Sequence, residues 1–141
     1  MAMFLVKTEP STYSFADLQR DKKTVWSGVS NPAALIQLRL MKVGDEVLVY
    51  HTGDEKAIVG LAKVVKGAYE DPAKPGKNER GEPKFAVVDL AAVNAVKKQV
   101  TLAEIKADAR FKEFGLVKLS RLSVMGVEAG MAKTLKELTS L

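Results

Sequence analysis

Polar side chains recur near the ends of the strands that the sequence predicts. They are Lys7-Thr8-Glu9, Ser27, Asn31, His51-Thr52, Ser120 and Ser123. These groups are good hydrogen-bond donors and acceptors, but their spacing contains no carboxylate pair, metal triad or activated nucleophile. The pattern therefore favours a binding pocket over an active site.

His51, the single histidine, is the side chain best suited to acid–base work near neutral pH. No serine elbow or cysteine accompanies it, and a histidine at a strand edge is more often a structural hydrogen-bonding group. An enzyme acting on a nucleobase, with His51 and Glu9 as acid and base, therefore ranks behind a binding module. Neither a G-x-G-x-x-G nor a Walker motif follows any predicted strand, so the sequence predicts no cofactor.

The stretch from Thr24 to Pro32 contains the only tryptophan, Trp26. Gly28 follows two residues later, where the backbone can turn or approach a ligand. Asn31 and Pro32 are typical of a helix start, since the amide oxygen can cap the first turn and proline fits the first helical position. Two interpretations of Trp26 remain open, a core residue or a stacking surface on a fixed loop before the helix.

Hydrophobic periodicity predicts an α+β fold, a small and mostly antiparallel curled sheet or open barrel with helices packed on it. The expected strands are 4–6, 46–51, 57–66, 85–96, 116–118 and 121–125, and the expected helices are 15–20, 32–41, 101–107 and 128–138. Gly60 inside a strand predicts a bulge or corner. Residues 71–83 carry repeated turn signals and are expected to form a charged loop.

The chain has 141 residues, which fits a single domain over 1–141. Its net charge of +5 and its pI near 9.4 favour an anionic partner, of which nucleic acid is the commonest. The absence of cysteine argues against disulfides and cysteine-based zinc sites. No apolar run is long enough for a membrane span or signal peptide, so we expect a protein of the cytoplasm. We also expect a monomer and no bound metal.

Six short motifs together resemble the EVE domain, in that family's order and spacing. They are Lys7-Thr8-Glu9-Pro10, Trp26-Ser27-Gly28-Val29-Ser30-Asn31, Val43-Gly44-Asp45, Tyr50-His51-Thr52, Ile58-Val59-Gly60 and Ser120-Arg121-Leu122-Ser123-Val124. The resemblance implies a PUA-like pseudo-barrel of about five to six strands flanked by short helices. It also implies a stand-alone, bacterial-type reader of a modified base, with modified cytosine in DNA as the usual ligand and RNA as the alternative.

The resemblance assigns site residues in three groups. Trp26 would be a stacking wall, and the pocket around it would be lined by Lys7, Thr8, Glu9, Ser27, Gly28, Val29 and Asn31. The opposite rim would be formed by Tyr50, His51 and Thr52. The mouth would hold Ser120, Arg121 and Ser123, where Arg121 could meet a phosphate.

The chain departs from the family pattern at the helix after Trp26. Many members have arginine at the position of Ser30, an aromatic residue at Pro32 and another arginine near Leu35. Three alternatives follow: phosphate contacts have moved elsewhere, nucleic-acid affinity is weak, or the ligand is a small molecule or peptide held by an interaction domain. The candidate replacement contacts are Lys42, Lys74, Lys77 and Arg80.

Overall fold

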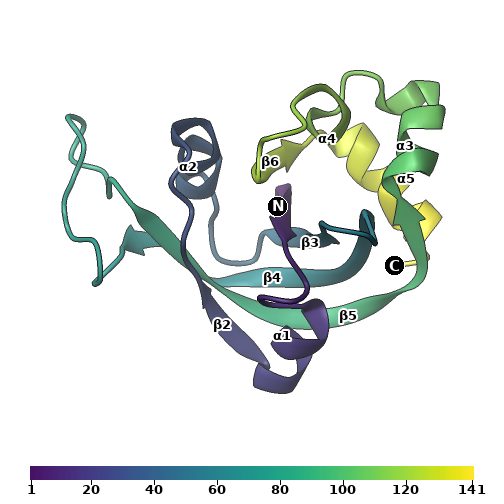
Figure 1. The fold of residues 1–141 in the computed structure, drawn as a ribbon. Coiled ribbons are helices and arrows are strands. Elements are labelled where there is room, and N and C mark those ends of the chain that lie inside the picture. The colour runs from purple at the N-terminus through teal and green to yellow at the C-terminus, as the bar shows by residue number, and fades with distance from the viewer.

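A computed structural model describes residues 1–141 and shows a six-stranded mixed sheet that is not closed into a barrel (Figure 1). The strands are β1 (Met3–Thr8), β2 (Lys23–Trp26), β3 (Glu46–His51), β4 (Ala57–Glu70), β5 (Ala86–Thr101) and β6 (Val124–Val127). Their order is β2-β5-β4-β3-β1-β6. Only the β1–β3 pairing is parallel, and the other four are antiparallel, which confirms the expected α+β, mostly antiparallel fold.

Short helices pack against the sheet in two groups. α1 (Phe15–Asp21) and α2 (Pro32–Arg39) bury side chains in one apolar core. α3 (Leu102–Ala107), a 3-10 turn, α4 (Gly115–Lys118) and α5 (Ala129–Thr139) bury theirs in a second core. Figure 1 shows α3, α4 and α5 gathered near β6 and the end of β5, apart from α1 and α2.

The central strands serve both cores by the alternation of their side chains. Val47 and Val49 of β3 lie in the first core, whereas Leu48 and Tyr50 lie in the second. Alternate side chains of this strand therefore belong to opposite cores. Burial on both faces also explains why β1 and β3 read as nearly continuous apolar runs.

Local capping signals fix where α1 and α2 begin. The Asn31 side-chain oxygen accepts from the amides of Ala33 and Ala34 at 2.9 and 3.1 Å, with Pro32 in the first turn, as expected. Ser14 and Asp17 form a capping box at the start of α1. These residues satisfy amides that no helical carbonyl can reach.

Three elements differ most from the sequence expectation. Trp26 does not stand on a loop but ends β2, an edge strand whose backbone pairs with β5, with Trp26 opposite Val88. The segment 116–118, expected as a strand, lies within α4, because a turn of helix buries Leu116 while the Leu119 amide bonds the Gly115 carbonyl at 2.8 Å. The last strand begins at Val124 rather than at Arg121.

The expected irregularity at Gly60 is a bulge in the β3–β4 pairing. Val49 pairs with Gly60 and Tyr50 with Ile58, which leaves Val59 as the extra residue. A Cβ atom on Gly60 would lie 2.4 Å from the ring of Phe15, which is buried in the first core. The lack of a side chain at Gly60 therefore leaves the space that the Phe15 ring of α1 occupies.

Replacing Gly60 with alanine is expected to lower the free energy of unfolding by about 1–3 kcal/mol, because the buried Phe15 ring must move. Gly67→Ala on the same strand is the matched control. Its Cβ would meet the Met41 carbonyl oxygen at 3.4 Å and the Lys42 Cα at 4.0 Å, so stability should change by less than about 1 kcal/mol. Urea unfolding followed by circular dichroism measures both variants, and equal losses would contradict the role assigned to Gly60.

Candidate functional site: two neighbouring clefts

A cleft of about 370 Å³ lies where β1, the following loop and β2 meet, and we refer to it as the tryptophan cleft. It is lined by Lys7, Thr8, Thr12, Tyr13, Thr24, Val25, Trp26 and Ser27. Its volume lies within the range common for small-ligand sites. The structure thus brings four of the expected residues together, namely Lys7, Thr8, Trp26 and Ser27.

Trp26 is both a core residue and a wall of this cleft. It is only 9% exposed and belongs to the first core. The ring of Tyr13 meets it nearly edge-on, with centroids 6.4 Å apart and an interplanar angle of 80°. The two interpretations left open by the sequence are therefore compatible, since one part of the indole fills the core and another faces the cleft.

Hydrogen bonds hold the loop that carries Tyr13. The Thr8 hydroxyl donates to the Tyr13 carbonyl at 2.6 Å, and the amides of Thr12 and Tyr13 donate to the Glu9 carbonyl at 2.9 Å. The Tyr13 hydroxyl donates to Asp21 at 2.8 Å. Burial, together with this carboxylate, raises the pKa of Tyr13, so the phenol stays neutral. Tyr13, the second aromatic side chain of the cleft, is therefore held in position by hydrogen bonds within the protein.

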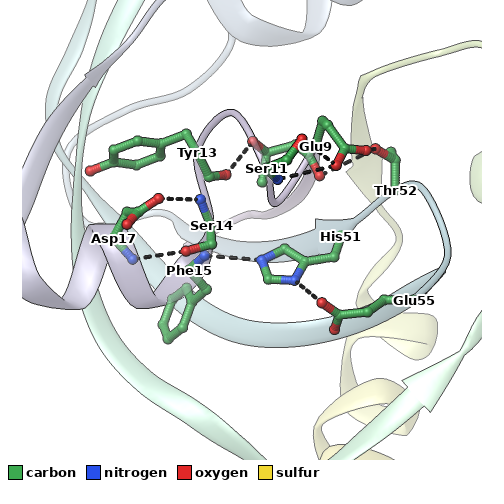
Figure 2. A network of polar contacts seen from close by, with 10 residues as sticks. Glu9, Ser11, Tyr13, Ser14, Phe15, Asp17, His51, Thr52 and Glu55 are labelled. Carbon is green, nitrogen blue, oxygen red and sulfur yellow. Dashed lines mark hydrogen bonds and ion pairs between the residues drawn. The ribbon is translucent and has the colours of Figure 1, made fainter.

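Glu9 is committed to the same loop (Figure 2). One carboxylate oxygen accepts from the amide and the hydroxyl of Ser11 at 3.1 and 2.9 Å, and the other accepts from the Thr52 hydroxyl at 3.3 Å. The Ser11 amide is the main cause that lowers the pKa of Glu9. A carboxylate stabilised in its charged form is poorly suited to accept a proton.

His51 is buried and has both ring nitrogens occupied (Figure 2). Its Nε2 accepts from the Phe15 amide at 3.0 Å, which assigns the proton to Nδ1. Nδ1 lies 3.0 Å from a carboxylate oxygen of Glu55. The imidazole thus joins the end of β3 to the start of α1, and it lines neither cleft.

A second hollow of about 180 Å³ adjoins the first, and we refer to it as the lysine pocket. It is lined by Lys7, Tyr50, Thr52, Gly53, Lys56, Leu102, Lys106, Leu116 and Ser120. Lys7 is common to both hollows. Tyr50, Thr52 and Ser120, expected around Trp26, therefore gather beside the tryptophan cleft rather than inside it.

A third hollow, larger than these two at about 610 Å³, is a groove between α2 and the segment before β5. Ser30, Pro32, Leu35 and Arg80 are among its lining residues, whereas Lys42, Lys74 and Lys77 line none of the three hollows. Arg39 is already used, donating to the carbonyls of Pro83 and Lys84 at 2.8 and 2.9 Å. With Glu79 and Glu82 beside its basic residues, this groove lacks the uniform charge of the lysine pocket.

Other expected site residues have structural positions outside the clefts. Gly28 has a φ of 81°, a left-handed backbone conformation that favours glycine over other residues. Val29 packs against the first core and Asn31 caps α2. The Ser123 carbonyl accepts from the Lys7 amide at 2.9 Å, and Arg121 is exposed.

Several lining residues were not anticipated from the sequence. They are Thr12, Tyr13, Thr24 and Val25 in the tryptophan cleft, and Gly53, Lys56, Leu102, Lys106 and Leu116 in the lysine pocket. Tyr13 carried the one usable signal, an aromatic residue just before a capping box. No group of three or more acidic or histidine side chains is placed to hold a metal ion. None of the helices combines the length and apolar character needed to cross a bilayer.

Comparison with known proteins identifies relatives along nearly the whole chain. A family profile described as the EVE domain matches residues 2–138. Human thymocyte nuclear protein 1 is 36% identical over 124 residues, 74% of this chain and 55% of that protein. The chain thus spans about half the length of the curated relatives it matches.

Solved structures agree with this result. The NMR structure of a Rhodopseudomonas palustris protein has a TM-score of 0.88 and 36% identity, covering 99% of this chain and 94% of that one. A crystal structure of human THYN1 protein in complex with DNA that contains 5-methylcytosine has a TM-score of 0.88 and 29% identity. That match covers 100% of this chain and 99% of that one.

Replacing His51 with alanine is expected to lower the free energy of unfolding by about 1–3 kcal/mol, because the buried Phe15 amide loses its acceptor. Glu55→Ala is the control, since it removes only the half-exposed partner of the same ring and should cost less than about 1 kcal/mol. Urea unfolding compares the two variants. If Glu55→Ala were the more costly change, the bond to Phe15 would not be the stabilising one.

The Asp17 carboxylate is expected to make stability depend on pH. The Ser14 amide is the main cause that lowers the pKa of Asp17 below the usual 3.8. The stabilising effect of the carboxylate is therefore complete above pH 3.8, and it is lost as the pH falls through the folded-state pKa. Asp17→Asn should therefore be less stable than the parent protein at pH 7, and the difference should shrink below about pH 4. Urea unfolding at several pH values tests this, with Asp54→Asn as a control, and a difference that grows in acid would contradict it.

Proposed function

Because this chain belongs to the EVE domain family, we propose that residues 1–141 form a single nucleic-acid-binding domain that reads a modified base. The ligand we propose first is modified cytosine in DNA, with a modified RNA base as the alternative. The observation that carries the proposal is the likeness, over the whole chain, to a human protein crystallised with 5-methylcytosine DNA. The domain is proposed to act without catalysis, as a monomer in the cytoplasm.

The tryptophan cleft is the proposed base site. Trp26 and Tyr13 supply two aromatic walls at a steep angle, suited to contact with the face and edge of a planar ring. The hydroxyls of Thr12 and Ser27 line the same cleft. A hydroxyl both donates and accepts, so such groups can pair with the amino group and carbonyl of a cytosine edge.

The structure also supports binding rather than turnover. Glu9 is held as a carboxylate by Ser11 and Thr52, and the nitrogens of His51 are occupied by Phe15 and Glu55. Neither side chain lines the tryptophan cleft. The two groups that sequence reasoning offered as acid and base therefore serve to hold the site in shape.

Energetics limit what the base pocket alone can achieve. Stacking of one base contributes about 1–3 kcal/mol, and flipping a base out of a duplex costs a few kcal/mol. One added methyl group is worth only about 1 kcal/mol. Affinity must then come partly from phosphate contacts, in keeping with the net charge of +5.

The single tryptophan makes the proposal testable by fluorescence. Short single- and double-stranded DNA carrying one central cytosine, unmodified, 5-methyl or 5-hydroxymethyl, is titrated into the protein, with matched RNA in parallel. We expect quenching of Trp26 and a preference of roughly fivefold for the methylated base, because one buried methyl group is worth about 1 kcal/mol.

Variants locate the site in the same experiment. Trp26→Phe keeps an aromatic ring in the core, and it should weaken the methyl preference measured by anisotropy without unfolding the protein. Ile36→Ala, in the groove beside α2, should bind as the parent protein does. Equal affinity for all cytosines would refute the reader function, and no binding at low salt would refute nucleic-acid binding altogether.

A further inference from the structure

The lysine pocket has a composition that sets it apart from the other hollows. Lys7, Lys56 and Lys106 contribute to its lining, and no aspartate or glutamate does. The rest of the lining combines hydroxyls with an apolar floor that includes Tyr50 and Leu116. A concave surface lined by positive charges concentrates the electrostatic field and attracts anions.

The pocket is held open by bonds within the chain. The Lys7 ammonium donates to the Ser120 carbonyl at 2.8 Å, which fixes this cation against the loop after α4. The Leu102 amide donates to the Lys56 carbonyl at 2.7 Å, which ties the turn after β3 to the start of α3. The Thr52 amide donates to the Thr8 carbonyl at 2.9 Å. The three lysines therefore approach the pocket from three separately anchored segments.

Lys7 lacks charge compensation from any carboxylate. It is half-buried, and its ammonium lies 5.9 Å from the centre of the Tyr50 ring. Burial lowers the pKa of Lys7, because desolvation disfavours the charged form. The nearest acidic group along the chain, Glu9, forms no ion pair with Lys7 and is bonded to Ser11 and to Thr52. Because Thr52 and Gly53 line the pocket, this one carboxylate borders it. An anion in the pocket would supply the missing countercharge.

We propose that the lysine pocket binds a backbone phosphate of the nucleic acid whose base enters the tryptophan cleft. Lys7 lines both hollows, so a nucleotide bound in one would place its sugar-phosphate toward the other. Lys56, in the turn between β3 and β4, and Lys106, on α3, complete the phosphate site. The inference rests on the proposed function for the source of the phosphate, but the anion site itself does not depend on it.

The first test measures how binding depends on salt. Lys56→Gln/Lys106→Gln is compared with Lys112→Gln/Lys133→Gln, which removes the same charge from exposed positions outside both hollows. With DNA containing 5-methylcytosine, the pocket variant should bind more weakly and lose about one unit from the slope of log K against log salt. Its preference for methylated over unmodified cytosine should persist, because the tryptophan cleft is unchanged. Equal slopes in the two variants would overturn the proposal while leaving the reader function intact.

A second measurement is independent of nucleic acid. Inorganic phosphate is titrated into the nitrogen-15-labelled protein, and amide shifts of Thr52, Gly53 and Lys106 are followed by NMR. We expect these amides to shift together and to saturate in the parent protein and the control variant, but not in the pocket variant. Shifts spread evenly over surface lysines such as Lys97 and Lys133 would overturn the site. Localised saturation without methyl-selective DNA binding would support the anion site and remove only the proposed function.

Discussion

The parallel pairing of β1 with β3 is the constraint on which both hollows depend. Parallel strands end at the same edge of a sheet, and this register places Thr8 beside His51 and Lys7 beside Tyr50. The chain leaves β1 into the loop that carries Tyr13 and leaves β3 into the turn that carries Thr52 and Lys56. The tryptophan cleft and the lysine pocket therefore open side by side, with Lys7 between them. An antiparallel pairing would have sent the two loops to opposite edges.

The polar groups around this edge act mainly on the shape of the site. Thr8, Glu9 and His51 each bond to a loop or to a helix start, and no buried side-chain polar atom lacks a partner. Leaving such a group unpaired costs more than the net gain from forming one bond, so the network holds a single arrangement. Glu9 and His51 thus make hydrogen bonds within the protein and do not line the tryptophan cleft, whereas Thr8 both bonds to the Tyr13 carbonyl and lines that cleft.

Local signals in the sequence were sufficient for much of the fold. The helix start at Asn31 and Pro32, the strand over 46–51 and the irregularity at Gly60 depend on residues close in the chain, and the structure agrees with each. β2 was missed because an edge strand half exposed to solvent has no clear alternation. α4 was mistaken for a strand because four residues are too few to show a helical period, and packing rather than propensity decides their conformation.

The site was harder to predict, because its geometry comes from pairings between distant segments. Family resemblance supplied Lys7, Thr8, Trp26 and Ser27, but nothing in the sequence places Tyr13 against Trp26 or brings Lys56 and Lys106 to Lys7. A cavity is a property of how elements pack, and lysines on three segments form a pocket only after the sheet has set their distances. Charge count alone indicated an anionic partner but could not show which lysines share a hollow. Lys42, Lys74 and Lys77, the candidate phosphate contacts, line none of the three hollows.

The burial of Trp26 determines which part of the proposed site would provide selectivity between bases and which part would provide affinity. A ring that is 9% exposed offers a limited stacking surface, so the tryptophan cleft, as the proposed base site, would discriminate by fit more than it attracts. Attraction then falls to charge, which acts over about 10 Å at moderate salt and is indifferent to sequence. Adjacent hollows sharing Lys7 couple the two tasks, because a phosphate held by the lysines fixes which base stands before the tryptophan cleft. In the proposed arrangement, specificity depends on a small apolar group on the base. Such a small difference is effective because the polar edge of the sheet has already fixed the position of the nucleic-acid strand.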